Sequence, residues 1–381
     1  MEEWKECKLS DICDYGKDRI EVSSLDNSNY ISTENMLPNR AGITTATTLP
    51  TGEYTPSFEI DDTLVSNIRP YFKKIWKATF SGGCSADVLV FKAKENVSKE
   101  YLYYVLADDE FFKYSMTTSK GTKMPRGDKT SIMNYPIKLP PLPTQQKIAA
   151  ILSSLDDKIE LNNKINTNLG RQAQALFKNW FVDKYEKEGT FGDYCAVKSG
   201  FAFKSAWWQD EGTKVIRIGD IEQGCLNLET CAHVATDKIE VAKDFIVQGG
   251  DLVIAMTGAT IGKFSMIPKT QEPILVNQRV GKFFLGNNPI EKVPFIYCTL
   301  KQEEVITEFV NRGQGSAQPN ISTGDILSIP CWIPNINEID NFNKTIQPMF
   351  ETIISNQEEN RKLSVLRDSL LPKLMNGEIE V

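Results

Sequence analysis

Histidine is almost absent from this sequence of 381 residues, and its cysteines lack the spacing typical of metal sites. His233 is the single histidine, and none of the eight cysteines forms a Cys-x-x-Cys pair. Protein zinc sites are commonly built from such pairs together with histidines. We therefore expect neither a metal site nor a disulfide framework, and we interpret the cysteines as free thiols.

Long apolar segments are also missing. No run approaches the ~20 residues that a membrane-spanning helix needs. The first residues, Met1-Glu-Glu-Trp4, are acidic and differ from a secretory signal, which has a basic start and an apolar centre. We expect a cytoplasmic protein that makes no contact with a membrane.

The sequence has no excess of positive charge, since its formal net charge is −7. Basic patches supply most of the non-specific affinity of proteins for nucleic acids. A role in nucleic-acid binding would therefore require local basic loops, or partners that contribute positive surface.

Instead, the chain repeats itself. Gly121-Thr-Lys-Met-Pro125 resembles Gly315-Ser-Ala-Gln-Pro319, and the same offset of 194 positions continues without a gap to Leu176 and Leu370. Upstream the likeness is looser: Asp62-Thr-Leu-Val65 resembles Gly250-Asp-Leu-Val253, and Leu9-Ser-Asp-Ile-Cys13 resembles Phe191-Gly-Asp-Tyr-Cys195. Two copies of one structural plan follow from this pattern.

Each copy ends in a segment with the periodicity of a long helix. Residues at alternating spacings of four and three form a heptad seam that asparagine interrupts at the same two places in both copies. A buried asparagine fixes the register of paired helices, although these asparagines could also face solvent on an irregular helix. The predicted seam residues are Ile159, Asn162, Asn166, Leu169, Leu176, Ile353, Asn356, Asn360, Leu363 and Leu370.

The remaining segments combine short β-rich runs with helical stretches around 99–115 and 292–311. We predict an α+β fold with a pseudo-twofold internal repeat, in which two α+β domains are joined by two long helices that form an antiparallel coiled coil. The predicted boundaries are 1–143 for the first domain, 144–186 for the central helix, 187–336 for the second domain and 337–381 for the C-terminal helix.

Three motifs connect this plan with a known family. The C-terminal segment from Glu359-Asn-Arg-Lys-Leu363 to Ile379 resembles the end of the specificity (S) subunits of type I restriction–modification systems. Leu139-Pro-Pro-Leu-Pro-Thr-Gln-Gln-Lys-Ile-Ala149, continuing to Leu155-Asp-Asp-Lys-Ile159, resembles their central conserved helix. Ser199-Gly-Phe-Ala-Phe-Lys-Ser205 resembles a segment near the start of their recognition domains.

The resemblance implies a DNA-binding protein without catalytic activity. Each target-recognition domain would read one half of an interrupted site in double-stranded DNA, and the coiled coil would set the spacing and dock two methyltransferase subunits. Those partners would bind S-adenosylmethionine and methylate adenine, so this chain itself would need no cofactor. The resemblance leaves open whether a restriction and translocation subunit also joins.

We expect polar or basic side chains in loops to contact DNA, because such groups recognise base edges and phosphates. In the first domain they fall in Ile68-Arg-Pro-Tyr-Phe-Lys-Lys74 and Lys120-Gly-Thr-Lys-Met-Pro-Arg126. The candidates are Arg69, Tyr71, Lys73, Lys74, Lys120, Thr122, Lys123 and Arg126.

In the second domain the candidates lie in a small glycine-bearing loop, in Asn277-Gln-Arg279 and in the polar segment that follows Arg312. Asparagine and glutamine amides suit adenine, and a guanidinium suits guanine. The candidates are Lys204, Thr257, Lys263, Asn277, Gln278, Arg279, Arg312, Gln314, Ser316, Gln318 and Asn320.

The sequence leaves two alternatives to a DNA specificity subunit. One is a coiled-coil scaffold that binds proteins and reads no DNA, and the other is an enzyme that modifies DNA alone. The enzyme is disfavoured because the chain has no Asn/Asp-Pro-Pro-Tyr/Phe motif, no glycine-rich cofactor fingerprint and no phosphate-binding loop. Scattered carboxylates do not exclude a nuclease site.

Overall fold

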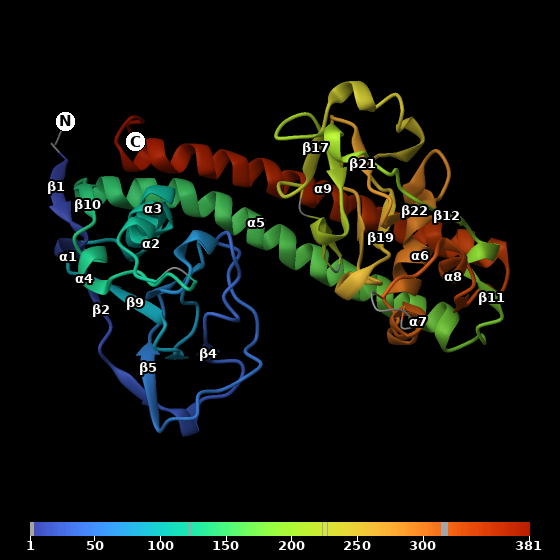
Figure 1. The fold of residues 1–381 in the computed structure, drawn as a ribbon. Coiled ribbons are helices and arrows are strands. Elements are labelled where there is room, and N and C mark those ends of the chain that lie inside the picture. Colours follow the sequence, from blue (N-terminus) through green and yellow to red (C-terminus); the bar gives the residue numbers. More distant parts are fainter. Residues whose placement is uncertain (1–3, 122, 223, 227, 314–318) are drawn as a thin grey trace. The chain divides into compact units, whose positions relative to one another are not determined.

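A computed structural model describes residues 4–121, 123–222, 224–226, 228–313 and 319–381. The chain divides into two compact units (Figure 1). Unit 1 comprises Met1–Lys158 and Leu363–Val381, and unit 2 comprises Ile159–Lys362. Each unit contains strands, short helices and a part of both long helices, which confirms the predicted α+β class.

Unit 1 contains two main sheets. The first has the order β2-β9-β6-β7, with the strands β2 (Cys13–Tyr15), β9 (Val88–Ala93), β6 (Thr63–Ser66) and β7 (Ile75–Lys77). The second has the order β3-β5-β8-β4, with the strands β3 (Arg19–Glu21), β5 (Tyr54–Phe58), β8 (Gly82–Cys84) and β4 (Tyr30–Ile31). The remaining elements are the pair β1 (Lys5–Lys8) and β10 (Pro136–Leu139) and the helices α1 (Leu9–Ile12), α2 (Lys99–Ala107), α3 (Asp109–Thr117) and α4 (Lys129–Ile132).

Unit 2 repeats the first sheet of unit 1, whereas its second sheet has five strands in place of four. Its first sheet has the order β12-β22-β19-β20, with the strands β12 (Ala196–Ser199), β22 (Val280–Phe284), β19 (Leu252–Ala255) and β20 (Phe264–Met266). Its second sheet has the order β13-β17-β14-β21-β18, with the strands β13 (Trp208–Gln209), β17 (Ala232–Val234), β14 (Thr213–Ile216), β21 (Ile274–Val276) and β18 (Ile246–Val247). The remaining elements are the pairs β11 (Gly189–Thr190) with β23 (Pro330–Cys331) and β15 (Ile221–Glu222) with β16 (Cys225–Leu226), and the helices α6 (Val293–Leu300), α7 (Glu303–Gly313) and α8 (Thr323–Leu327).

The repeat extends to individual hydrogen bonds, which confirms the predicted duplication. The Lys8 N–H donates to the Asp11 carboxylate at 2.8 Å, and in unit 2 the Thr190 N–H donates to the Asp193 carboxylate at 2.8 Å. One prediction of register was wrong by a residue. Asp62 corresponds to Asp251 rather than to Gly250, because each carboxylate accepts the N–H three residues earlier and precedes the strand β6 or β19.

The long helices are α5 (Leu142–Phe177), which ends in a π-helical turn at Lys178–Val182, and α9 (Ile336–Met375). The Asn335 side chain accepts the Glu338 N–H at 2.9 Å and caps the start of α9. Pro348 lies inside α9 and does not mark its beginning. Its ring leaves no N–H for the helical ladder, yet the helix continues because neighbouring side chains are packed in the core.

In both units α5 and α9 run in opposite directions, as predicted (Figure 1). In unit 2 the Asn162 amide donates to the Asn360 side-chain oxygen at 2.8 Å, and the Asn356 amide donates to that of Asn166 at 2.9 Å. Asn162 is fully buried, so these asparagines face the other helix rather than solvent. The polar contacts fit one register only, since a shift by one turn would separate the paired amides.

Apolar seam residues pack on either side of these asparagines. Leu169, Leu176 and Ile353 join the core of unit 2, and Leu370 packs against the core of unit 1. Ile159 and Leu363 are half-buried. The helices are therefore held mainly by apolar packing, and the asparagines determine the alignment.

An ion pair fixes the helices in unit 1 and leads to a first prediction. Arg367, whose side chain is 14% exposed, donates to Asp156 at 2.7 Å, and the Tyr104 hydroxyl also donates to Asp156. Asp156→Ala removes one of the two carboxylates that pair with this largely buried guanidinium, leaving Asp368, and it also removes the acceptor of the Tyr104 hydroxyl. We therefore expect the free energy of unfolding to fall by about 2–3 kcal/mol. Chemical denaturation measures this loss. The exposed neighbour Asp157→Ala should change it by less than about 0.5 kcal/mol, and a similar small effect for Asp156 would contradict the prediction.

Candidate nucleic-acid interface

The turn between β6 and β7 presents the first group of predicted DNA contacts. Its centre is a 3₁₀ helix, η2 (Pro70–Phe72), between two non-glycine residues with left-handed backbones, Arg69 (φ 50°) and Lys73 (φ 51°). This conformation costs roughly 1–2 kcal/mol for a residue with a Cβ atom. Tyr71 and Phe72 lie at the tip and are 48% and 37% exposed. Strained backbones of this kind often occur at functional sites.

Side chains within unit 1 hold this turn in place. Lys73 forms an ion pair with Asp109 at 2.8 Å, and Arg40 also pairs with that carboxylate. The Lys74 ammonium donates to the Thr33 carbonyl at 2.6 Å, and burial lowers the pKa of Lys74. Both predicted lysines are therefore bound to internal partners. The Tyr71 side chain instead contacts the neighbouring Phe72 ring, with 4.6 Å between the ring centroids.

The second loop of unit 1 lies directly against this turn. The Arg69 N–H donates to the Pro125 carbonyl at 2.8 Å, and Ile68 forms an isolated bridge with Arg126. Lys120 pairs with Asp128 at 2.6 Å, and this bond together with the Ser131 N–H lowers the pKa of Asp128 to about 2. We refer to residues 67–74 and 120–127 as the paired loops of unit 1. Lys123 is exposed, and Thr122 lies outside the described residues.

Two buried polar atoms in these loops have no hydrogen-bond partner in the part of the chain that the structure describes. They are the side-chain oxygen of Asn67 and the Nε atom of Arg69. Buried polar groups usually find a partner, and one left without costs about 1–3 kcal/mol. Two polar groups of the paired loops of unit 1 therefore remain unsatisfied within the described part of the chain.

Unit 2 builds the same feature from different residues. The Gly258 N–H donates to the Pro319 carbonyl at 2.9 Å, and Thr257 forms an isolated bridge with Asn320. Glycines occupy the two left-handed positions, Gly258 (φ 71°) and Gly262 (φ 80°), where unit 1 has Arg69 and Lys73. We refer to 256–263 and 319–321 as the paired loops of unit 2. The Thr257 hydroxyl is buried there without a partner among the described residues.

A hollow of about 670 Å³ opens beside these loops. Arg279, Gln278 and Asn320 line it and are exposed, so their amide and guanidinium groups are available to a ligand. Asn277 holds the turn that carries Arg279, because its side-chain oxygen accepts the Arg279 N–H at 3.3 Å. The hollow is also lined by Ser199, Met256, Thr257, Ile321, Ser322 and Thr323.

The other predicted DNA contacts of unit 2 differ in their exposure and in their bonding to the rest of the unit. The Arg312 guanidinium donates a hydrogen bond to the Glu308 carboxylate on its own helix. It also donates to the Asp325 and Ser328 carbonyls and to the Ser328 hydroxyl, so it connects the end of α7 to α8. Lys263 is half-buried at the end of the first loop. Lys204 is exposed and lies over the Trp207 ring at 5.5 Å. Gln314, Ser316 and Gln318 lie outside the described residues.

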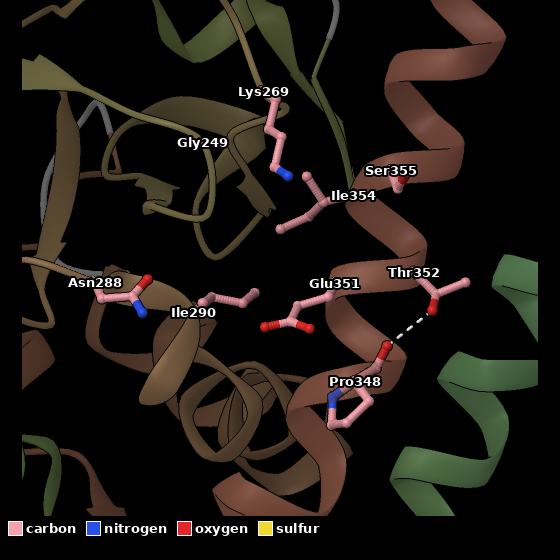
Figure 2. A pocket seen from close by; sticks show the side chains of 9 residues that line it. All are labelled: Gly249, Lys269, Asn288, Ile290, Pro348, Glu351, Thr352, Ile354 and Ser355. Atoms are coloured by element: carbon pink, nitrogen blue, oxygen red, sulfur yellow. Dashed lines mark hydrogen bonds between the residues drawn. The ribbon is translucent and has the colours of Figure 1, made fainter.

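A second hollow in unit 2, of about 610 Å³, lies against α9. Figure 2 shows Glu351 on α9 and Lys269 on a neighbouring loop among its lining residues. Thr352 turns back onto its own helix, where its hydroxyl donates to the Pro348 carbonyl at 2.8 Å. None of the predicted DNA contacts lines this hollow, so it is separate from the paired loops.

The structure adds Asp87 to the paired loops of unit 1, which the sequence did not indicate. Its carboxylate pairs with Arg126 at 3.1 Å. Ser85-Ala-Asp87 shares no residue with Asn277-Gln-Arg279, so only the register of the strands shows that the two turns correspond.

The described residues contain no cluster of three or more histidine, cysteine, aspartate or glutamate side chains arranged for a metal ion. Burial raises the pKa of the Cys13, Cys84 and Cys195 thiols to about 12, so these thiols stay protonated at neutral pH. Within the same described part of the chain, none of the helices is both long and apolar enough to span a bilayer.

Comparison with known proteins gives consistent matches. The model of the type I restriction modification DNA specificity domain matches residues 1–171 and 184–366. The HindI specificity subunit of Haemophilus influenzae is 25% identical over 468 aligned residues, covering the whole of both chains. The MjaVIII specificity subunit of Methanocaldococcus jannaschii is 27% identical over 321 residues, covering 79% of this chain and 75% of that protein.

A solved structure is similar along almost the whole chain. The crystal structure of the type I restriction–modification S subunit from M. genitalium superposes with a TM-score of 0.58 at 16% identity, covering 98% of this chain and 96% of that one. At this level of identity the similarity concerns the fold.

Proposed function

Because the chain belongs to the family of type I restriction–modification DNA specificity subunits, we propose that it reads a two-part sequence in double-stranded DNA for such a system. The observation that carries this proposal is the pair of loops built once in each unit. A protein that presents equivalent surfaces twice is suited to a target with two half-sites. Since the loop residues differ between the units, the two half-sites should differ in sequence.

We assign to DNA the loop side chains that either lack an ion pair among the described residues or form one that is exposed to solvent. In unit 1 the first kind are Arg69, Tyr71 and Lys123, and the second kind are Lys120 and Arg126, whose side chains are 82% and 57% exposed. Lys73 and Lys74 are half-buried and position the turn through their internal partners. In unit 2 the assigned residues are Thr257, Gln278, Arg279 and Asn320, with Lys204 and Lys263 as candidates for phosphate contacts, whereas Asn277 and Arg312 hold the turns.

The two long helices would set the half-site spacing and dock two methyltransferase subunits. At 1.5 Å per residue, the 36 residues of α5 and the 40 of α9 span roughly 54 and 60 Å. Both helices carry exposed apolar side chains, which a partner could cover: Ile151, Leu161, Ile165, Val365 and Leu366. S-adenosylmethionine and the chemistry of adenine methylation would then belong to the methyltransferase, and this chain would not be catalytic.

A genome-wide map of adenine methylation tests the proposal. The host would carry the gene with its neighbouring methyltransferase, with and without this chain. We expect an interrupted two-part motif that is methylated only when the chain is present. Unchanged methylation without the chain, while the methyltransferase is active, would favour a protein-binding scaffold instead.

A further inference from the structure

The paired loops of the two units correspond position by position, because the same backbone hydrogen bonds connect them. The Asn67 N–H donates to the Asp87 carbonyl at 2.8 Å, and the Met256 N–H donates to the Arg279 carbonyl at 3.0 Å. The next bonds correspond as well, since Gly127 donates to the Asn67 carbonyl and Ile321 to the Met256 carbonyl. Asp87 therefore occupies in unit 1 the position that Arg279 occupies in unit 2.

The turns that carry these two residues also correspond. The Val88 N–H donates to the Ser85 carbonyl and the Val280 N–H to the Asn277 carbonyl, both at 2.9 Å. Asp87 and Arg279 each receive a further contact at their own N–H, from the Ser85 hydroxyl and from the Asn277 side chain. The backbone is thus the same, while the side chain changes from a hydrogen-bond acceptor to a donor.

The neighbouring position changes in a matching way. Arg126 corresponds to Asn320, since each forms the isolated bridge with the first loop of its unit. In unit 1 Arg126 and Asp87 pair at 3.1 Å, with side chains that are 57% and 34% exposed. An ion pair this exposed contributes little to stability, so exchanging it for contacts with a ligand costs little.

We propose that Asp87, together with Arg126, is a specificity-determining residue of the first recognition domain and that the pair reads one C·G base pair. This inference rests on the proposed function. In the major groove, cytosine offers an N4 amino donor beside the O6 and N7 acceptors of guanine. The Asp87 carboxylate accepts from the amino group and the Arg126 guanidinium donates to guanine, so that each group exchanges its present partner for a base.

The carboxylate also disfavours bases that present no amino donor in the major groove, such as thymine. A negative charge beside DNA is repelled by phosphate unless it meets a donor, and thymine offers a carbonyl where cytosine offers its amino group. In unit 2 the corresponding positions hold Arg279 and Asn320, which suit guanine and adenine. The chemistry of these corresponding positions would then make the two half-sites different.

The test is an Asp87→Asn variant in the complex with its methyltransferase, read out by methylation of a library randomised in both half-sites. We expect one base pair of the first half-site to lose its preference for C·G by roughly 5- to 140-fold, with a shift towards A·T, which asparagine favours. Arg126→Gln should relax the same base pair. The control is Asp14→Asn, an exposed aspartate on β2 outside the paired loops.

The outcomes distinguish a failure of the Asp87 assignment from a failure of the proposed function. If the variants lower methylation of all sequences alike, Asp87 merely positions Arg126 on phosphate and the inference is overturned. If they relax different base pairs, or the second half-site, it is equally overturned. If the wild-type chain imposes no two-part motif, the proposed function itself fails.

Discussion

Arg279→Ala should abolish the preference for one base pair in one half-site and leave the other half-site unchanged. Arg279 lies at the hollow beside the paired loops of unit 2 and is exposed. A guanidinium that meets guanine is worth about 1–3 kcal/mol of discrimination, so the preference should fall by roughly 5- to 140-fold. Methylation of a randomised target library by the assembled complex measures this change.

The matched control removes a positive charge elsewhere in unit 2. Lys292 is exposed and lies next to α6, outside the paired loops. We expect Lys292→Ala to weaken binding slightly at all sequences without changing the motif, because loss of a single cation acts on non-specific attraction. Loss of both half-sites together in Arg279→Ala, or of neither, would show that Arg279 does not read a base.

The second large effect concerns stability rather than recognition. Phe342 on α9 is fully buried, and its ring lies 5.8 Å from that of Phe177 and 5.2 Å from that of Phe181. Phe342→Ala removes this packing and leaves a cavity, so we expect the free energy of unfolding to fall by about 3–5 kcal/mol. Chemical denaturation followed by circular dichroism measures the loss.

An exposed residue of the same helix provides the comparison. Val365 is 57% exposed, and Val365→Ala should change the free energy of unfolding by less than about 0.5 kcal/mol. Equal effects of the two substitutions would mean that α9 is not held by the aromatic cluster. Since the Phe342 substitution acts on the core of unit 2, correctly folded complexes should keep the wild-type motif.

The sequence by itself determined the plan of the molecule. Heptad spacing and the constant offset of 194 positions predicted the long helices and the duplication, because helical periodicity and repetition are local properties of the chain. The same pattern placed Asn162 and Asn360 on helix faces that the structure shows to be hydrogen-bonded. The sequence also predicted the loops around Arg69 and Arg126 as DNA contacts, because their basic residues and glycine can be recognised without knowledge of the fold.

Only the tertiary structure decided which of these side chains are available. The sequence predicts DNA contacts at Lys73, Lys74 and Arg312. In the structure Lys73 pairs with Asp109, Lys74 donates to the Thr33 carbonyl, and Arg312 donates to carbonyls at the end of α8. The partners of the two lysines lie more than 30 positions away along the chain, so their proximity depends on how the loops pack. Strand register makes Asp87 correspond to Arg279. The backbone hydrogen bonds that set this register do not depend on the side chains, so the two unrelated sequences give no sign of the correspondence.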